Sequence, residues 1–582
     1  MAVLHKATVV FLPLFFAAAA AQFFQNPYMG GFSFDNGFGG APAKKGDYET
    51  HYKGKWELVC NNSGVSAMHL VLMPNNKAIM FDTTSSGPSN IKLPPGHCRI
   101  YKEKNETKKD CWAHGIEYDI HTGFIRTLKS FTHAQSNRSR PTSGVQLVHF
   151  LQMGLLCRSV GSDNGGRAAR YLSPCDTCDW TEYPTALSVE RWYASQQILP
   201  DGSFIVVGGR RQFSYEYVPK PGQSNPTNFK LPFLLQTSDA VEDNLYPFVH
   251  LSTDGNLFIF ANNRSILLDP KFNSIVRELP QLKGGARNYP GSAMSALLPI
   301  NLHTQTTPPP ARVLICGGTP HESAKLAVDG HFLPALRTCG SISITSPTGK
   351  WRVETMPTAR VMGDMLLLPT ADLLLINGAK KGAAGWGSAT DPNLEPVMYR
   401  PRKPRAKRFM KLRPSAIPRM YHSTSAVLPD GRILVAGSNT NRVYKFSGVA
   451  YPTELRVEKF SPPYLDPHLA LYRPLIVSSF ERTVVGHGEA FSLRFALADV
   501  VVELSDLKLT MYAPPFTTHG YSMNQRLLIL RAMDLVMVGP TMYEITWVAP
   551  STAAIAPPGY YLVFLVHRGV PSEGIWIRIR IQ

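Results

Sequence analysis

A tyrosine and a histidine stand side by side at Tyr421 and His422, directly before a segment that begins at Asp430-Gly431 and ends in a glycine. A phenolate oxygen and an imidazole nitrogen are both able to bind a redox-active metal. In most proteins, however, such a dipeptide serves only packing and hydrogen bonding. A second segment of the same pattern, Glu190 to Gly209, has Tyr193 at the matching position. This repetition favours a shared role for the two tyrosines.

Both segments belong to a series of short apolar runs that close with a glycine or a turn. Such a run predicts a buried strand that follows a tight turn. The later runs begin about 50 to 60 residues apart, near the period of a kelch blade. The pattern predicts an all-β fold with a seven-bladed kelch-type β-propeller over residues 49–467. The runs begin at Lys77, Asp201, Asp254, Arg312, Asp372 and Asp430.

A different pattern begins after the proline-rich segment Phe460 to Pro467. Alternating strands follow, such as Glu489 to Phe495 and Tyr560 to Val566. About 110 residues of this kind match the size of an immunoglobulin-like β-sandwich. We therefore expect a second, immunoglobulin-like domain over residues 468–582.

The N-terminus has the pattern of a secretory signal. Residues 1–21 combine a basic start, an apolar run and small residues, which predicts a cleaved signal peptide. Residues 22–48, rich in Gly, Phe and Asn, are expected to form a flexible linker. No later apolar run reaches the roughly 18 residues that a membrane span needs. We therefore expect a secreted, extracellular protein of the cell wall or apoplast, without a membrane span.

The net charge of +18 favours an acidic partner. Secretion excludes nucleic acid, so an acidic polysaccharide is the candidate. The densest basic run lies between Arg400 and Arg413, where interleaved prolines predict an exposed loop. A solvated loop without a partner explains this run equally well.

The eight cysteines are more readily explained as disulfides than as zinc ligands, because secretion leads to an oxidising compartment. Cys175 and Cys178 have redox-motif spacing but no βαβ context, which favours a structural bridge. Cys60 and Cys157 are left unpaired. The expected disulfides are Cys98 with Cys111, Cys175 with Cys178, and Cys316 with Cys339. Glycosylation sequons stand at Asn61, Asn105, Asn137 and Asn263.

Ordered motifs along nearly the whole chain resemble one known family. They are Gly64 to His69, Leu93 to Arg99, Asp110 to His114, Arg191 to Ser195, Gly208 to Glu216, Pro418 to Ser423 and Pro571 to Trp576. Together they resemble the radical-copper oxidases, specifically the glyoxal oxidase-like aldehyde oxidases related to galactose oxidase.

The resemblance implies a single copper ion held by four side chains. Tyr193 would be the tyrosinate that carries the radical, and Tyr421 the axial tyrosine and proton acceptor. His422 would be one imidazole ligand, and His519, in the matching segment Phe516 to Arg526, the other. Two imidazoles and two phenolates suit Cu(II) and leave a position for water or substrate. Copper and an oxidised tyrosine together provide two-electron chemistry.

The reaction that the resemblance implies is aldehyde oxidation. A hydrated aldehyde and O2 would give a carboxylic acid and H2O2. Alcohol oxidation of the galactose oxidase kind is a weaker variant. The tryptophan that stacks on the galactose oxidase cofactor has no clear counterpart here, because Arg210 and Arg211 follow the glycines.

The family also links its radical tyrosine to a cysteine through a thioether, in a Trp-Cys-Ser-Ala-Gly-like segment. The chain reads Ser143 to Gly161 where this segment is expected, without any blade pattern. Joining the third base of each codon to the first two of the next permits Trp-Cys-Ser-Ala-Gly-Ala-Phe-Ser-Ala-Asn-Gly-Thr. We infer, as a hypothesis, that residues 143–161 are written in a shifted reading frame. Cys157 would then be an accident of that frame, although it could still serve as the linking cysteine.

If the linking cysteine is truly lost, a different class of function is open. The chain would be a catalytically silent secreted propeller that binds acidic cell-wall polysaccharide through its basic surface.

Overall fold

The computed structural model describes residues 45–103, 106–129, 148–150, 165–304, 306–477, 484–498 and 501–580. The predicted signal peptide, most of the predicted linker and Cys157 lie outside the described residues. So does the segment Ser143 to Gly161, apart from the backbone of residues 148–150.

Strands dominate the described chain, as the sequence predicts. The α-helices, α1 (Pro232–Gln236) and α2 (Ser323–Val328), have one or two turns each. None of the helices in the described ranges has the length and apolar character needed to cross a membrane. The 3-10 turns are Thr84–Ser86, Gly165–Arg167, Arg405–Lys407, Pro463–Leu465, Pro467–Tyr472 and Leu504–Asp506.

Antiparallel sheets follow one another along the chain. In the central sheets, hydrogen bonds join neighbouring strands in the order in which they occur along the chain. The first central sheet contains β11 (Ala194–Ile198), β12 (Phe204–Gly208), β13 (Ser214–Tyr217) and β14 (Phe229–Lys230), and the second contains β15 (Phe248–Leu251), β16 (Leu257–Ala261), β17 (Arg264–Asp269) and β18 (Ser274–Leu279). The third contains β19 (Met294–Leu297), β21 (Arg312–Cys316), β22 (Thr338–Ser343) and β23 (Arg352–Thr355). The fourth contains β24 (Asp364–Leu367), β25 (Leu373–Ile376), β28 (Val397–Tyr399) and β29 (Phe409–Lys411).

Two further sheets form near the N-terminus, with short hairpins beside the main series. The sheets are β2 (His69–Leu72), β3 (Lys77–Phe81), β6 (Gly115–Asp119), β7 (Ile125–Leu128), and β8 (Val148–Phe150), β9 (Ala169–Leu172), β10 (Thr181–Tyr183). The hairpins are β4 (Arg99–Glu103) with β5 (Glu106–Asp110), and β26 (Ala379–Gly382) with β27 (Ala389–Pro392).

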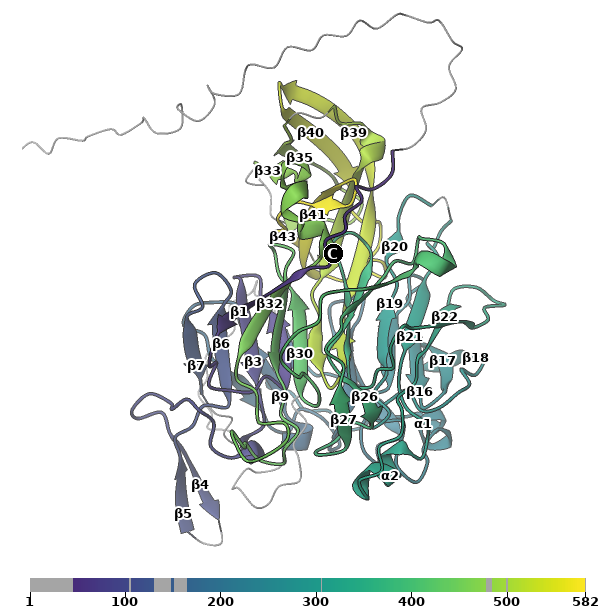
Figure 1. The fold of residues 1–582 in the computed structure, drawn as a ribbon. Helices are drawn as coiled ribbons and strands as arrows, with labels where there is room; N and C mark the ends of the chain where they lie inside the picture. The colour runs from purple at the N-terminus through teal and green to yellow at the C-terminus, as the bar shows by residue number, and fades with distance from the viewer. Residues whose placement is uncertain are drawn as a thin grey trace, which may run out of the picture. The chain divides into compact units, whose positions relative to one another are not determined.

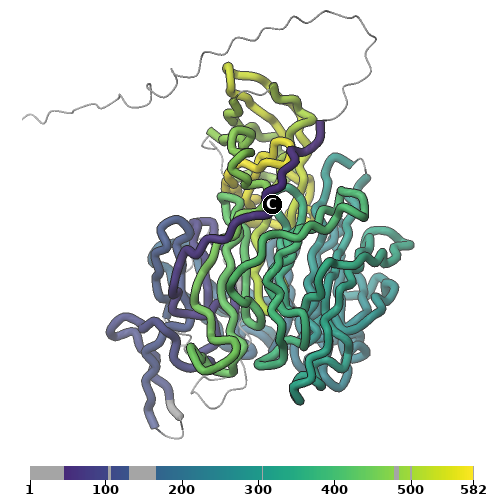
Figure 2. Tube along the Cα trace, in the orientation of Figure 1, coloured from purple at the N-terminus to yellow at the C-terminus, as the bar shows by residue number. Residues whose placement is uncertain are grey.

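Strands from both ends of this region share one sheet. β30 (Ser423–Val427), β31 (Ile433–Gly437) and β32 (Val457–Ser461) are joined by β1 (Lys55–Cys60), which pairs with β32 in the register Lys55 to Ser461. Figure 2 shows the purple N-terminal trace running along green segments from late in the chain. This pairing fastens the start of the sheet series to its end.

The first strands of successive sheets contact one another in turn. β11 contacts β15, β15 contacts β19, β19 contacts β24, β24 contacts β30, and β30 contacts β2. Contacts of this kind between successive first strands are typical of a β-propeller. The number of seven blades stays a prediction, because the sheet of β8, β9 and β10 is described by three strands only.

A buried arginine recurs before these first strands. Arg191 donates to the carbonyl of Gly208 at 2.8 Å, and Arg419 to that of Gly437 at 2.6 Å. Gly208 and Gly437 are the last residues of the second strands, β12 and β31 (Ile433–Gly437). The arginine therefore joins the segment before the first strand to the end of the second strand by a hydrogen bond. Arg287 and Arg360 bind Gly317 and Asn377 in the same way.

A carboxylate balances two of these buried guanidinium groups. Arg191 pairs with Glu216 at 2.8 Å, and Arg419 pairs with Glu458 at 2.9 Å. Burial lowers the pKa of Arg191 and Arg419, while the neighbouring glutamates raise it. Tyr193 and Tyr421 stand two residues after these arginines, so the arginines fix the backbone that carries them.

The C-terminal region forms an extended sheet that is open at both ends. Its order is β33 (Leu475–Ile476), β35 (Ala490–Ala496), β40 (Met542–Val548), β39 (Arg526–Gly539), β36 (Leu507–Ala513), β41 (Gly559–His567), β43 (Ile575–Ile579) and β34 (Val484–Val485), with β20 (Ile300–Asn301) and β42 (Val570–Pro571) at its side. The first half of β39 pairs with β36 and the second half with β40. Figure 1 shows β33, β35, β39 and β40 together, away from β16, β17 and β18.

One hairpin from this C-terminal region packs among the first strands of the earlier sheets. β37 (Phe516–Thr518) pairs with β2, so that Thr518 lies opposite His69. Its partner β38 (Tyr521–Met523) contacts β11, β19 and β24. The turn between them, with His519, is thereby held among the first strands. The two predicted domains are therefore joined by hydrogen bonds as well as by the chain.

The basic run from Arg400 to Arg413 is exposed at most positions and contains no α-helix, as expected. It also includes a 3-10 turn and the short strand β29, which the sequence did not predict. Acidic side chains also neutralise part of it, because Lys411 pairs with Glu395 at 2.9 Å and Arg408 pairs with Glu354. These pairs weaken the argument for a polysaccharide partner.

In the structure, disulfides join Cys98 to Cys111, Cys175 to Cys178 and Cys316 to Cys339. Cys60 is free and half-buried. Of the sequon residues, Asn61 is exposed and Asn263 half-buried, while Asn105 and Asn137 lie outside the described residues.

Replacing Arg191 with methionine should destabilise the fold strongly. The change leaves Glu216 as a buried charge without its partner, and we expect a loss of about 3–5 kcal/mol in the free energy of unfolding. Denaturant unfolding measures this loss. Arg494→Met is the matched control, because Arg494 pairs with Glu544 at 2.6 Å on the surface. There the expected change is about 0–1 kcal/mol, and equal losses in both variants would contradict the assignment.

Candidate functional site

The structure brings the four predicted ligands together. Tyr193 precedes β11, Tyr421 and His422 precede β30, and His519 lies between β37 and β38. The hydroxyl oxygens of Tyr193 and Tyr421, 228 positions apart, are 2.9 Å from each other. The rings of His422 and His519 have centroids 4.8 Å apart, and those of Tyr193 and His519 4.9 Å apart. All four side chains are buried.

Three of these residues have a strained backbone. The φ angles of Tyr193, His422 and His519 are +64°, +62° and +51°, in the left-handed region that side chains other than glycine rarely occupy. Hydrogen bonds hold this conformation, including one from the Tyr246 amide to the Tyr193 carbonyl at 2.8 Å. Strain of this kind persists where the surroundings over-determine it, and it clusters at functional sites.

Thr518 fixes the tautomer of His519. Its hydroxyl donates to the Met68 carbonyl at 3.1 Å, and its oxygen lies 2.7 Å from Nδ1 of His519. A hydroxyl has one proton, so when Thr518 donates to the Met68 carbonyl its oxygen is left to accept from Nδ1 of His519, which also lies 3.3 Å from the Tyr246 hydroxyl. Nε2 of His519 then has a free lone pair, as in a metal-binding histidine whose other nitrogen is held by a hydrogen bond.

The imidazole nitrogens at the centre lack partners. Nδ1 and Nε2 of His422 and Nε2 of His519 are buried, and none has a hydrogen bond within the described part of the chain. Buried polar atoms are normally paired, so these nitrogens point to a ligand. Burial lowers the pKa of His422 to about 3 and that of His519 well below its usual range. Both imidazoles are therefore neutral, the form that binds metals.

The two phenols need a cation before they can ionise. Burial raises the pKa of Tyr193 and Tyr421 well above 10, and the neighbouring phenols raise it further. A metal ion would supply the missing positive charge. Two neutral imidazoles and two phenolates fit Cu(II), so these residues suit the metal that the sequence predicts.

Sequence reasoning missed the aromatic residues around Tyr193. The Trp192 ring stacks on that of Tyr193, with centroids 4.4 Å apart and an angle of 27°. The Tyr246 ring also stacks on it, at 4.9 Å. Tyr289 meets it edge-on at 4.4 Å and places its hydroxyl 3.2 Å from that of Tyr421. A stacking tryptophan is therefore present. It is visible in Arg191-Trp-Tyr193, but the sequence does not show the direction of its ring.

His69 is a third buried histidine in this region, and sequence reasoning gave it no role. Its ring stacks on Phe81 at 4.5 Å and meets the His519 ring at 6.3 Å. Its Nδ1 has no partner among the described residues, and burial lowers its pKa to about 3. The pairing of β2 with β37 places it there.

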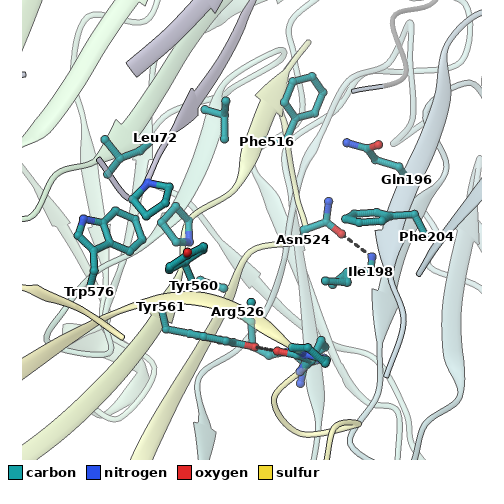
Figure 3. A pocket seen from close by; sticks show the side chains of 17 residues that line it. Leu72, Gln196, Ile198, Phe204, Phe516, Asn524, Arg526, Tyr560, Tyr561 and Trp576 are labelled. Atoms are coloured by element: carbon teal, nitrogen blue, oxygen red, sulfur yellow. Dashed lines mark hydrogen bonds between the residues drawn. The ribbon is translucent and has the colours of Figure 1, made fainter. Parts of the chain in front are cut away.

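A separate pocket of about 130 Å³ lies where β2, β11 and the C-terminal sheet meet. Figure 3 shows its apolar walls, with Phe204 and Ile198 on one side and Trp576 and Tyr560 on the other. Asn524 accepts a hydrogen bond from the Ile198 amide at 2.7 Å beside it. None of the four predicted ligands lines this pocket, so it is distinct from the cluster.

Comparison with known families assigns most of the chain. The family described as "Glyoxal oxidase N-terminus" matches residues 68–464. The family described as "Galactose oxidase-like, Early set domain" matches residues 473–579. The first match ends at residue 464 and the second begins at residue 473.

Individual relatives agree. "Aldehyde oxidase GLOX1" of Arabidopsis thaliana is 50% identical over 535 residues, which cover 91% of this chain and 85% of the relative. "Aldehyde oxidase GLOX" of Vitis pseudoreticulata is 41% identical over 530 residues, covering 90% and 97%.

A solved structure, described as a fungal alcohol oxidase of the AA5 family in complex with copper, shares the fold. Its TM-score is 0.50 at 16% identity, over 90% of this chain and 99% of that one. The predicted resemblance is thus confirmed at the level of family and fold. The chain is an oxidase of the glyoxal oxidase family, with a galactose oxidase-like early set domain at its C-terminal end.

Proposed function

We propose that this protein is a secreted, copper-dependent oxidase that converts aldehydes to carboxylic acids. The observation that carries the proposal is the buried cluster of two phenols and two neutral imidazoles with unpartnered nitrogens. The names of the relatives, which are aldehyde oxidases, support the choice of substrate class.

Tyr193, Tyr421, His422 and His519 would hold the copper. When bound, copper would accept one electron of a two-electron oxidation, and an oxidised Tyr193 the other. The overall reaction is R-CH(OH)2 plus O2 to R-COOH plus H2O2. Two electrons and two protons pass from the aldehyde hydrate to O2.

Tyr421 is the proposed proton acceptor. Its hydroxyl lies between those of Tyr193 and Tyr289, at 2.9 and 3.2 Å. A proton received at this oxygen can therefore be shared along a chain of phenols. Burial raises the pKa of Tyr421, which favours the protonated phenol as the product of that proton transfer.

Trp192 and Tyr246 are proposed to protect the oxidised form of Tyr193. Their stacked rings exclude water from the phenol ring and hold it in place. Arg210 lies over the Trp192 ring at 5.0 Å and pairs with Glu242 at 2.8 Å, which keeps the tryptophan in place.

The proposal also includes secretion of the protein and a shifted reading frame over residues 143–161. The three disulfides agree with an oxidising compartment. The frame hypothesis rests on the sequence of residues 143–161, most of which lie outside the described residues.

The silent polysaccharide-binding alternative is not favoured. The four ligands come together, and ion pairs neutralise part of the basic run.

Replacing His422 with alanine should weaken copper binding by more than about tenfold, because it removes one of the two neutral imidazoles. Copper content after loading and dialysis, with the Cu(II) EPR spectrum, measures the change. His250→Gln is the control, since His250 is equally buried but bonds to Ser295 at 2.8 Å, away from the cluster. Similar copper loss in both variants would argue against the assigned ligands.

Copper-loaded protein should release H2O2 with glyoxal or methylglyoxal, and Tyr193→Phe should abolish that release while copper remains bound. The phenylalanine ring cannot form the tyrosyl radical. A peroxidase-coupled assay measures the rate. A folded, copper-loaded chain that carries the linking cysteine and yields no peroxide would refute the proposed reaction.

Transcript sequencing across codons 143–161 should give the Trp-Cys-Ser-Ala-Gly frame. The mass of the matching peptide from the purified protein provides a second measurement. Reads that reproduce the printed residues Val145 to Gly161 would reject the frame hypothesis.

A further inference from the structure

A second polar cluster joins the loop between α1 and β15 to the segment that follows β21. Ligand atoms of Asp239, Asp243 and His321 all lie within 4.8 Å of one another. The Nδ1 atom of His321 is 3.5 Å from Oδ2 of Asp243. None of the three belongs to the predicted copper centre.

Asp243 is the member of this cluster that needs a partner. Its side chain is only 1% exposed, and its Oδ2 accepts no hydrogen bond within the described ranges. That atom faces His321 and Asp239. A buried carboxylate oxygen without a donor is unfavourable unless a cation or a proton compensates it.

The rest of the cluster is already in position and open to solvent. Asp239 is held by amide donors from Val241 and Asp243, at 3.2 and 3.0 Å, and by the Asn262 side chain at 3.0 Å. The His321 side chain is 46% exposed, so a cation can reach the site from outside.

We propose that Asp239, Asp243 and His321 form a second metal site that binds a divalent cation, with Zn2+ as the best match. Imidazole nitrogen and carboxylate oxygen are both zinc ligands, and three such side chains leave the fourth tetrahedral position to water. In a tetrahedral site with the usual bond lengths, neighbouring ligand atoms lie about 3.4 Å apart. The three side chains, whose ligand atoms are within 4.8 Å of one another, would therefore have to move closer together by up to about 1.4 Å.

Such an ion would stabilise the loop that packs on Tyr193. In this loop, Glu242 lies between Asp239 and Asp243 and pairs with Arg210. Tyr246 follows Asp243, and its amide donates to the Tyr193 carbonyl. A cation here would fix both contacts without touching the predicted copper ligands.

The competing explanation is a proton shared by the two carboxyl groups. Burial, followed by the charge of Asp239, raises the pKa of Asp243 to about 8. In that case the cluster is complete without a metal.

Zn2+ binding to the full-length chain separates the two explanations. The test uses a His422→Ala background, so that zinc in the copper centre is not counted, with equilibrium dialysis and elemental analysis. We expect about one Zn2+ per chain and a rise in melting temperature, since a ligand that binds only the folded state stabilises it. Adding Asp243→Asn should weaken binding by at least about tenfold and remove the rise.

Two further variants complete the design. His321→Ala changes an exposed side chain, so it tests the site where Asp243→Asn fails to fold, and it should also weaken Zn2+ binding. Asp254→Asn is the matched control, because Asp254 lies in a turn where it accepts from the Asn256 amide at 3.1 Å. It should bind Zn2+ as its parent does. No Zn2+ uptake by the parent, or unchanged uptake after Asp243→Asn, would overturn the proposal in favour of the shared proton.

Discussion

The buried arginines that begin the first strands are the interaction on which this structure depends. Arg191 and Arg419 bind main-chain carbonyls of the second strand and pair with Glu216 and Glu458. A buried guanidinium is tolerated only where its charge and donors are satisfied. A tyrosine stands two residues after each of these arginines. The same hydrogen bonds therefore join the start of the first strand to the end of the second and position a phenol among the first strands.

The central cluster combines strain with missing partners. Tyr193, His422 and His519 adopt left-handed backbone conformations, and the imidazole nitrogens are buried without hydrogen bonds among the described residues. Such an arrangement is unfavourable without a ligand and favourable with a metal ion. The site is therefore preorganised by its surroundings, chiefly by the Thr518 hydroxyl and by the loop that supplies Tyr246.

The aromatic shell connects this centre to the surface of the protein. Tyr193 contacts Trp192, Trp192 contacts Arg210, and Arg210 pairs with Glu242. Glu242 belongs to the loop with Asp239 and Asp243. If this loop became more or less rigid, the change would be transmitted to the Tyr193 phenol through the Glu242–Arg210 ion pair and the Trp192 ring. The proposed metal ligands would not have to move.

The strand pattern and the resemblance to the family follow from the amino-acid order, and the resemblance implies the four proposed ligands. Asp-Gly turns and apolar runs are short-range signals for strands, and ordered motifs such as Pro418 to Ser423 carry the resemblance. The charges of residues 400–413 do not by themselves show that Glu354 and Glu395 neutralise part of this segment, because those pairs depend on how neighbouring strands are placed. How the ligands meet depends on tertiary contacts, since His519 reaches Tyr193 through the pairing of β37 with β2. The stacking of Trp192 likewise depends on side-chain direction. Strand register and side-chain direction have no local signal, because each is set by the packing of segments that the sequence keeps far apart.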